Sequence, residues 1–345
     1  MERLEADVHA LAAMPRGSAR DEAATAAWLV QRLAEVGIEA RTQPYRGRTT
    51  YAWAFALLGL AGLSRRAWLR LAAVVALELD ASGRAPLPVG TAEGTNVVAR
   101  IPARGEKRGT LVLLAHHDTQ RPGLVWHPAL HRPGARGRLA KRSIPPYLGV
   151  TALIVLLGRR RLSLALAALA VEQALHTAVP GANDNATGVA AVLTLLERYA
   201  ADPLDGIEVV GALVGCEESG MHGARAFLRA EGLDPATTLV ISLDTLGSGT
   251  PVVLRAEHAL LRHAYAERDL ELVPPEVERW SIGGWTDALQ AKLLGLPALS
   301  ILSVGPEGNF THYHHPSDLP EHVDFACVRR CAEAVEQTVR AWRPH

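Results

Sequence analysis

Hydrophobic residues recur at helical spacing near the start of the chain. In residues 3–14 and 21–36 they stand three or four positions apart, and Pro15, Gly17 and Gly37 separate or follow the two segments. This spacing gathers apolar side chains on one face of a helix, whereas proline and glycine end helices. The pattern predicts an amphipathic helix in each segment.

From residue 96 onward the apolar residues fall in short runs that are typical of β-strands. Turn residues bound these runs, which cover 96–101, 110–115, 207–214, 237–243, 251–254 and 297–302. Helical patterns lie between several of them, notably over 188–200 and 221–229. Because nearly all-apolar strands that alternate with helices are covered on both faces, we expect an α/β fold with a mixed, mainly parallel central sheet flanked by helices.

Two long apolar stretches do not follow this alternation. Residues 51–79 and 147–175 each contain an apolar arm, a turn with an arginine cluster, a second apolar arm and then an acid. Each stretch is predicted to form an inserted helical hairpin. The predicted division is a discontinuous α/β domain of residues 1–50, 86–125 and 178–345, a first hairpin over 51–85, and a connector with the second hairpin over 126–177.

The apolar character of the hairpins requires a decision on whether they cross a membrane. Each apolar arm has 11 to 14 residues, whereas crossing the hydrocarbon takes roughly 20. If both hairpins crossed twice, their arginine turns would lie opposite the rest of the chain, against the positive-inside rule. Three hypotheses stay open: the hairpins form a helical subdomain in which they bury one another, they are both embedded shallowly in a membrane, or their arms are short transmembrane helices.

Composition excludes several classes of protein. Of the 345 residues, 48% are hydrophobic, which excludes a disordered chain. The 36 basic residues balance 36 acidic ones, so the chain lacks the positive net charge expected of a dedicated nucleic-acid-binding protein. The three cysteines cannot form a disulfide framework. The first residues lack the basic start and apolar stretch of a secretory signal. We expect the protein on the cytoplasmic side, either soluble or associated with a membrane.

Acidic residues and histidines follow four of the predicted strands. In chain order they are His116 and Asp118, Glu217 and Glu218, Asp244, and the loop histidines His312, His314 and His315. The polar turn GANDNATG adds Asp184 ahead of a predicted helix. Because ligands bind beyond the carboxyl ends of strands in an open α/β sheet, we expect these side chains to meet at one edge.

Each cluster alone has an ordinary explanation, such as helix capping for Asp184 or solvent exposure for the glutamates and the histidine loop. Together they point to metal binding. Imidazole and carboxylate without thiolate suit zinc in an open catalytic site, and two metal ions that share a bridging carboxylate need about five protein ligands. The sequence supplies that number.

The order of these motifs resembles the co-catalytic zinc exopeptidases, family twenty-eight of the metallopeptidases. The matching segments are HHD from His116, GANDNATG from Gly181, GCEESGMHGARAF from Gly215, SLDTLG around Asp244 and YHHPSD from Tyr313. The family includes bacterial aminopeptidases, and glutaminyl cyclases are relatives in fold. The resemblance spans the α/β domain and neither hairpin.

The resemblance implies a role for each matching residue. His116 and Asp244 complete opposite metal sites with Glu218 and His314, while Asp184 bridges the two ions. The other implied roles are Glu217 as the general base, Asp118 as the residue that orients His116, Tyr313 as the group that steadies the tetrahedral intermediate, and Asp287 as a substrate-binding residue. Two departures from the family are Cys216 before the glutamate pair and His315 in place of a frequent threonine, so His312 and His315 stay open as alternatives to His314.

The function implied is that of a zinc-dependent aminopeptidase, which hydrolyses the first bond of peptides with a free N-terminus and holds two Zn²⁺ ions, or one. The alternatives are a glutaminyl-cyclase-like acyltransferase with a single zinc ion and a non-catalytic scaffold at a membrane surface. The expected partners are peptides and no nucleic acid. Contact with a membrane surface, or self-association through the apolar hairpins, is a further open alternative.

Overall fold

The computed structural model describes residues 2–130, 135–143, 147–258 and 260–344. Within these ranges a 10-stranded sheet runs in the order β1-β2-β5-β3-β6-β10-β7-β9-β4, with β8 paired to β7. The strands are β1 (Ala40–Arg48), β2 (Thr91–Ile101), β3 (Arg104–His116), β4 (Arg142–Ser143), β5 (Asp205–Val214), β6 (Thr238–Leu243), β7 (Thr250–His258), β8 (Arg262–Ala264), β9 (Glu278–Ile282) and β10 (Ala298–Val304).

Four neighbouring strands at the centre of the sheet, β5, β3, β6 and β10, run parallel to one another. Antiparallel pairing begins outside them, between β5 and β2 and between β10 and β7. The mixed, mainly parallel sheet predicted from the apolar runs is therefore confirmed. Because parallel strands share a direction, the carboxyl ends of these four strands lie at the same edge.

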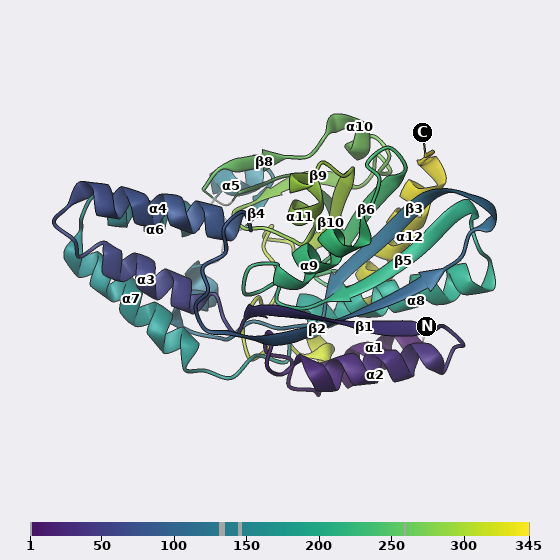
Figure 1. The fold of residues 1–345 in the computed structure, drawn as a ribbon, viewed down its shortest axis with the longest axis horizontal. Helices are drawn as coiled ribbons and strands as arrows, with labels where there is room; N and C mark the ends of the chain where they lie inside the picture. Colours follow the sequence, from purple (N-terminus) through teal and green to yellow (C-terminus); the bar gives the residue numbers. More distant parts are fainter. Residues whose placement is uncertain (1, 131–134, 144–146, 259, 345) are drawn as a thin grey trace.

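Helices cover the two faces of the sheet (Figure 1). On one side α8 (Thr187–Ala201) packs against β3 and β5, with α1 (Glu2–Ala12) and α12 (Phe325–Ala341) against α8. On the other side α9 (His222–Glu231) and α11 (Ala288–Leu293) pack against the strands and against each other. The remaining helices of this body are α2 (Glu22–Ala34), α5 (Ala135–Leu139) and α10 (Glu267–Leu270), and short helical turns lie at η1 (Leu124–Trp126), η2 (Pro128–Leu130), η3 (Ala182–Ala186) and η4 (Pro320–His322).

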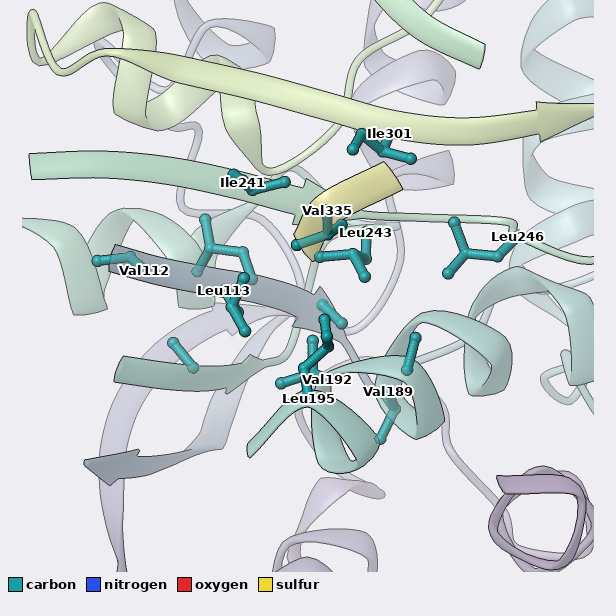
Figure 2. Packing of buried hydrophobic residues seen from close by; sticks show 14 of the residues in the cluster. Val112, Leu113, Val189, Val192, Leu195, Ile241, Leu243, Leu246, Ile301 and Val335 are labelled. Carbon is teal, nitrogen blue, oxygen red and sulfur yellow. The ribbon is translucent and has the colours of Figure 1, made fainter. Parts of the chain in front are cut away.

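The main core lies between the central strands and α8. Figure 2 shows Leu113 of β3 and Leu243 of β6 close to Val192 of α8, and all three side chains are fully buried. Burying a side chain of this kind contributes roughly 1.5–3 kcal/mol. This packing fixes the strand ends on which the candidate site stands.

Strand β1 was not predicted from the sequence. Its residues are largely polar and include Pro44, so the run lacks the apolar signature of the central strands. It lies at the edge of the sheet, where it pairs only with β2. An edge strand tolerates proline and needs few buried side chains, which explains why hydrophobic pattern alone does not show it.

Four helices project from the sheet as a separate bundle, here called the four-helix arm (Figure 1). They are α3 (Ala52–Ala61), α4 (Ala67–Ala81), α6 (Tyr147–Leu156) and α7 (Arg160–Ala174). Leu58, Leu77 and Val155 belong to the buried cluster that joins α3, α4 and α6. The helices fall where the hairpins were expected, but the division into domains stays a prediction, and parts of the predicted connector lie outside the described residues.

Among the described residues, no helix is both long enough and apolar enough to span a bilayer.

A buried ion pair connects the arm to the sheet. Arg48, at the end of β1, donates from Nη1 to both carboxylate oxygens of Asp80 in α4, at 2.8 and 2.7 Å, and neither side chain has any exposed area. Arg48 also donates from Nε to the carbonyl oxygen of Ser219, at 3.0 Å. The end of the arm is thus tied to the loop that follows β5.

Replacing Asp80 with alanine is expected to lower the free energy of unfolding by about 3–5 kcal/mol, because it leaves Arg48 buried without its counter-ion. Urea unfolding of the Asp80→Ala variant measures this loss. Asp202 is the matched control, since its carboxylate is exposed and its pairing with Arg104 lies at the surface. Equal stability losses in the two variants would show that the buried pair does not hold the arm.

Candidate active site

The carboxyl ends of the four central strands deliver histidine and carboxylate side chains to one edge of the sheet. His116 is the last residue of β3, and Asp244 follows β6 directly. Glu218 comes from the loop after β5, and His314 from the loop after β10. All four side chains are buried, although most of these residue types are normally exposed.

Two groups of potential metal ligands share one residue. His116, Asp184 and Asp244 form the first group, and Asp184, Glu218 and His314 form the second, with the ligand atoms of each group within 4.8 Å of one another. In the first group, Nε2 of His116 lies 3.4 Å from Oδ1 of Asp184 and 3.7 Å from Oδ1 of Asp244. In the second, Nε2 of His314 lies 3.1 Å from Oδ2 of Asp184 and 3.1 Å from Oε2 of Glu218.

The chemistry of these groups fits bound cations. Nε2 of His116 and Oε1 of Glu218 are buried and have no hydrogen-bond partner among the described residues. Burial would raise the pKa of Asp184, but His116 and His314 outweigh it and lower that pKa, so the carboxylate is charged. Burial lowers the pKa of His314, yet Glu218 and Asp184 raise it to about 9. Buried carboxylates and imidazoles that lack other partners suit Zn²⁺.

The turn that carries Asp184 is held by two residues that sequence analysis did not single out. The Asp318 carboxylate accepts hydrogen bonds from the backbone nitrogens of Asn183, at 2.8 Å, and Asp184, at 3.0 Å. The Arg16 guanidinium donates to the carbonyl oxygen of Gly181, at 2.7 Å. Gly181 itself has a φ of 61°, a left-handed conformation that favours glycine. The chain is thereby fixed on both sides of the shared carboxylate.

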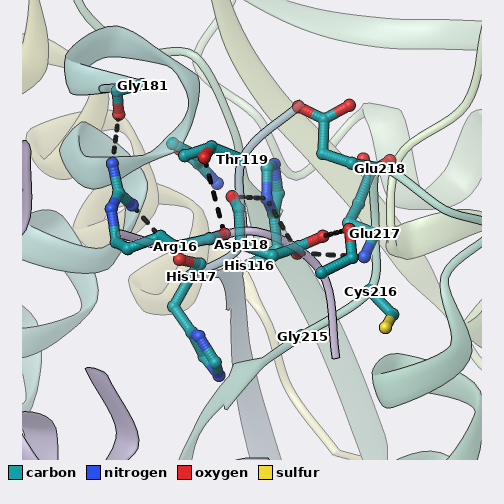
Figure 3. Close-up of polar contacts among 12 residues, drawn as sticks. Arg16, His116, His117, Asp118, Thr119, Gly181, Gly215, Cys216, Glu217 and Glu218 are labelled. Carbon is teal, nitrogen blue, oxygen red and sulfur yellow. Dashed lines mark hydrogen bonds and ion pairs between the residues drawn. The ribbon is translucent and has the colours of Figure 1, made fainter. Parts of the chain in front are cut away.

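Asp118 lies beside His116 and also contacts the loop of Glu217 (Figure 3). One of its carboxylate oxygens accepts a hydrogen bond from Ser18 at 2.6 Å, and the other accepts one from the backbone nitrogen of Glu217 at 3.1 Å. The latter oxygen also lies 3.5 Å from Nδ1 of His116. Asp118 therefore links the position of the His116 ring to that of the Glu217 backbone.

Glu217 stands beside the ligand groups on a strained turn. The preceding Cys216 has a left-handed φ of 55°, which is uncommon outside glycine. Backbone strain of this kind is frequent where a loop presents a functional side chain. Burial raises the pKa of Glu217 well above the usual range; His116 opposes this shift and the neighbouring Glu218 reinforces it. A carboxylate with a raised pKa is a stronger proton acceptor.

Of the three loop histidines, the structure brings only His314 into a ligand group. Nδ1 of His312 and Nδ1 of His315 each lie 2.7 Å from the Ser317 hydroxyl, and the His312 ring stacks on His322. The left-handed backbone at His312 and His314 turns these neighbouring side chains in different directions.

The His314→Ala variant is expected to lose the ion of its own ligand group, whereas His312→Ala and His315→Ala should keep the metal content of the wild type, because only His314 faces the shared Asp184. Metal content per chain, measured by plasma mass spectrometry after gel filtration, distinguishes the three. Loss of metal in the His312 or His315 variant with retention in the His314 variant would reassign the ligand.

A family model identifies the family of the chain. The family model described as "Peptidase family M28" matches residues 163–339. The chain belongs to peptidase family M28. The assignment makes the protein a zinc metallopeptidase, with one or two zinc ions as its cofactor. The matched range contains Asp184, Glu218, Asp244 and His314 and begins after His116. A comparison with curated proteins found no match.

Solved structures share the fold. An aminopeptidase from Aneurinibacillus sp. strain AM-1 is 16% identical, with a TM-score of 0.61 over 100% of this chain and 94% of that one. A zinc aminopeptidase from Bacillus subtilis is 11% identical, with a TM-score of 0.56 over 98% of this chain and 94% of that one. A glutaminyl cyclase from Bacteroides thetaiotaomicron is 14% identical, with a TM-score of 0.57 over 99% and 96%.

Two neighbouring cavities open onto this peptidase site. The inner cavity is lined by the carboxylates of Asp184, Glu217 and Asp244 and by apolar side chains such as Leu302 and Phe310. The outer cavity is lined by Glu217 and Glu218, by Tyr51, and by Ala52, Phe55, Leu148 and Gln173 of the arm. Glu217, Tyr313 and His314 border both cavities.

Tyr313 stacks on the His314 ring, with ring centroids 3.6 Å apart. Burial raises its pKa well above the usual value, and Asp184 and Glu218 reinforce the shift, so the hydroxyl keeps its proton at neutral pH. Asp287 is 1% exposed and begins α11, but it does not line either cavity. Both of its carboxylate oxygens are buried without a hydrogen-bond partner among the described residues. Its assignment as a substrate-binding residue stays a prediction.

Sequence reasoning also missed two side chains that hold the second ligand group. Nε2 of Gln120 donates to Oε2 of Glu218 at 3.0 Å, and the Trp126 ring meets the His314 ring edge-on at 4.1 Å between centroids. Both residues lie in the proline-rich segment after β3, where nothing in the local pattern marks them. Their contacts depend on how that segment folds back over the site.

Proposed function

We propose that this peptidase is an aminopeptidase that uses two zinc ions and acts on peptides with a free N-terminus. The observation that carries the proposal is the sharing of Asp184 between two ligand groups, since two metal ions held close together need a bridging carboxylate. His116 and Asp244 would hold one ion, Glu218 and His314 the other. Bound zinc lowers the pKa of water and polarises the carbonyl group of the substrate.

Glu217 is the general base of the proposed reaction. Its buried carboxylate borders both cavities, and its raised pKa suits it to accept a proton from the attacking water. The same carboxyl group then returns the proton to the leaving amine. Asp118 acts as a positioning residue, because it contacts both the His116 ring and the Glu217 backbone.

Tyr313 is the proposed hydrogen-bond donor to the oxygen that becomes negative in the transition state. Its hydroxyl keeps its proton at neutral pH, and its ring is fixed by stacking on His314. A donor held in place before the reaction stabilises developing charge without further reorganisation.

The inner cavity supports a specificity for the N-terminal residue. A free α-ammonium group would lie toward Asp184, Glu217 and Asp244, while an apolar side chain would lie against Leu302 and Phe310. A peptide chain that continued beyond this residue would replace the ammonium group with an uncharged amide and leave these carboxylates without a positive partner. Cleavage is therefore restricted to the first bond, and apolar N-terminal residues are favoured.

The residue after the scissile bond would occupy the outer cavity, where Phe55 of the arm forms part of the wall. Phe55→Ala is expected to raise KM about ten-fold for dipeptides with an apolar second residue and to change kcat little, because it removes binding common to ground and transition states. Steady-state kinetics measure KM and kcat separately. Leu57→Ala is the matched control, since Leu57 lies on the same helix but is 45% exposed. An unchanged KM in the Phe55 variant would remove the arm from substrate binding.

The experiment that tests the proposed reaction compares one peptide in three forms. Mass spectrometry should show release of the first residue from the free peptide and none from its N-acetylated form. For the form that begins with glutamine, release of glutamine supports the aminopeptidase. Loss of ammonia with the peptide bond intact would instead assign the cyclase reaction that one structural relative carries out.

A further inference from the structure

The four-helix arm exposes large apolar side chains on every one of its helices. Most of the large apolar side chains that are exposed in the described residues belong to it. They are Leu57 and Leu60 on α3, Trp68, Leu69, Leu71 and Val75 on α4, Val150, Leu153 and Leu156 on α6, and Leu162, Leu164 and Val171 on α7. A monomeric protein in water rarely exposes a contiguous apolar surface of this kind without a partner for it.

Small residues form the contact between α3 and α7. A side chain at Gly59 would lie 2.8 Å from the backbone of Ser163 and Ala167, so the two helices approach closely. This close approach leaves the leucines on the outside, for example Leu60 and Leu164. Helices in lipid commonly meet through small residues, whereas helices in water bury their large apolar side chains against each other.

Charged residues of the arm lie only near its two ends: Glu78, Asp80 and Glu172 near the sheet, and arginines at the far tip. Residues 52–64, 71–77, 147–158 and 162–171 contain no charged side chain. Six arginines lie in or directly beside the two turns at the tip, and they are Arg65, Arg66, Arg70, Arg159, Arg160 and Arg161. Arg70 ties the two turns together through the carbonyl oxygens of Ser64 and Leu156. The other five are exposed and make no ion pair within the described residues.

We propose that the four-helix arm docks on a membrane that contains anionic lipid. Exposed apolar side chains lie on all four helices, so a single protein partner on one side would leave many of them in water, whereas lipid can adapt to several sides of the arm at once. The arginine tip is complementary to anionic headgroups, which attract clusters of basic residues near the membrane surface. Trp68 lies between Arg66 and Arg70 in the chain and is 62% exposed, as expected of an aromatic residue at a membrane interface.

The length of the arm limits how deeply it enters. α3 and α6 have 10 residues each, or about 15 Å at 1.5 Å per residue, against a hydrocarbon thickness of about 30 Å. The arm therefore lies at a shallow angle in the headgroup and outer acyl region, where the arginines reach the phosphates. The sheet and the peptidase site remain outside the lipid. This inference does not depend on the proposed reaction.

Vesicle flotation of the full chain tests the proposal. The wild-type protein should float with phosphatidylcholine vesicles that contain phosphatidylglycerol, and added salt should weaken the binding. The tip variant Arg65→Ser/Arg66→Ser should bind about ten-fold less. The control Arg20→Ser/Arg229→Ser makes the same change in charge at exposed positions away from the arm and should bind like the wild type.

A second pair of variants tests the apolar surface. Trp68→Ser/Leu71→Ser should lose vesicle binding, and Leu261→Ser/Leu294→Ser, with both leucines exposed outside the arm, should keep it. Equal thermal midpoints for all variants exclude unfolding as the cause, since these positions are exposed. Failure of the wild type to float, or binding that neither arm variant weakens, would overturn the proposal. An arm-dependent dimer in sedimentation without vesicle binding would assign the surface to a second copy of the chain.

Discussion

Glu217→Gln is expected to lower kcat by at least about 100-fold and to leave the metal content unchanged. Glutamine has nearly the same shape as glutamate but cannot accept a proton, and removing a general base typically costs two to four orders of magnitude in rate. The Glu217 carboxylate belongs to neither ligand group, so its loss should not release metal. The expected result is therefore a protein that binds metal and substrate yet turns over slowly.

Steady-state hydrolysis of an aminoacyl arylamide and metal analysis of the same preparation measure both quantities. Glu276→Gln is the matched control, because Glu276 is exposed and distant in sequence from the site motifs. An unchanged kcat in the Glu217 variant would exclude this residue as the base. Loss of metal together with activity would instead make it a ligand.

Asp184→Ala should remove metal from both ligand groups and abolish activity. The carboxylate has one oxygen 3.4 Å from Nε2 of His116 and the other 3.1 Å from Nε2 of His314, so it is common to the two groups. Without it, each group keeps two protein side chains, fewer than the three that a catalytic zinc site normally has. The loss should therefore exceed that caused by replacing a ligand of one group alone.

Metal content per chain distinguishes loss of the shared carboxylate from loss of a ligand that belongs to one group. The expected series is two ions in the wild type, none in Asp184→Ala, and at least one in Asp244→Ala, which removes a ligand of a single group. Asp202→Ala, at an exposed position, is the control for general effects of the substitution. Two ions retained in Asp184→Ala would contradict the bridging role.

The central part of the fold could be predicted because its signals are local and strong. Each of the strands β3, β5, β6 and β10 contains a nearly continuous apolar run that only burial on both faces explains. Since the four run parallel, an acid or histidine after each one had to reach the same edge. The approximate position of the site follows from the sequence for that reason.

Other parts of the site could not be predicted because they depend on contacts between distant segments. Asp318 holds the Asp184 turn across 134 residues of chain, and Arg16 reaches Gly181 across 165. A lone arginine after proline, or an aspartate in a loop, has no spacing pattern that reveals such a partner. Only the folded chain shows which backbone groups these side chains satisfy.

The contacts of the two apolar hairpins also could not be fully predicted from the sequence. The second hairpin is inserted between His116 and Asp184, which already suggests a place over the site, but nothing in the sequence indicated that Phe55 of the first hairpin would line the cavity beside Glu217. The buried Arg48–Asp80 pair, which orients the arm against the catalytic loop, joins a polar edge strand to the end of an apolar helix. Nothing in the sequence of either element indicates that the other is its partner.

The most direct test of the account is metal content per chain measured together with aminoacyl arylamide hydrolysis, with and without a chelator. We expect two zinc ions per chain, loss of hydrolysis when the chelator removes them, and recovery when zinc is returned. One zinc ion without arylamide hydrolysis would favour the cyclase reaction. Hydrolysis that survives removal of all metal would contradict the assignment of the site.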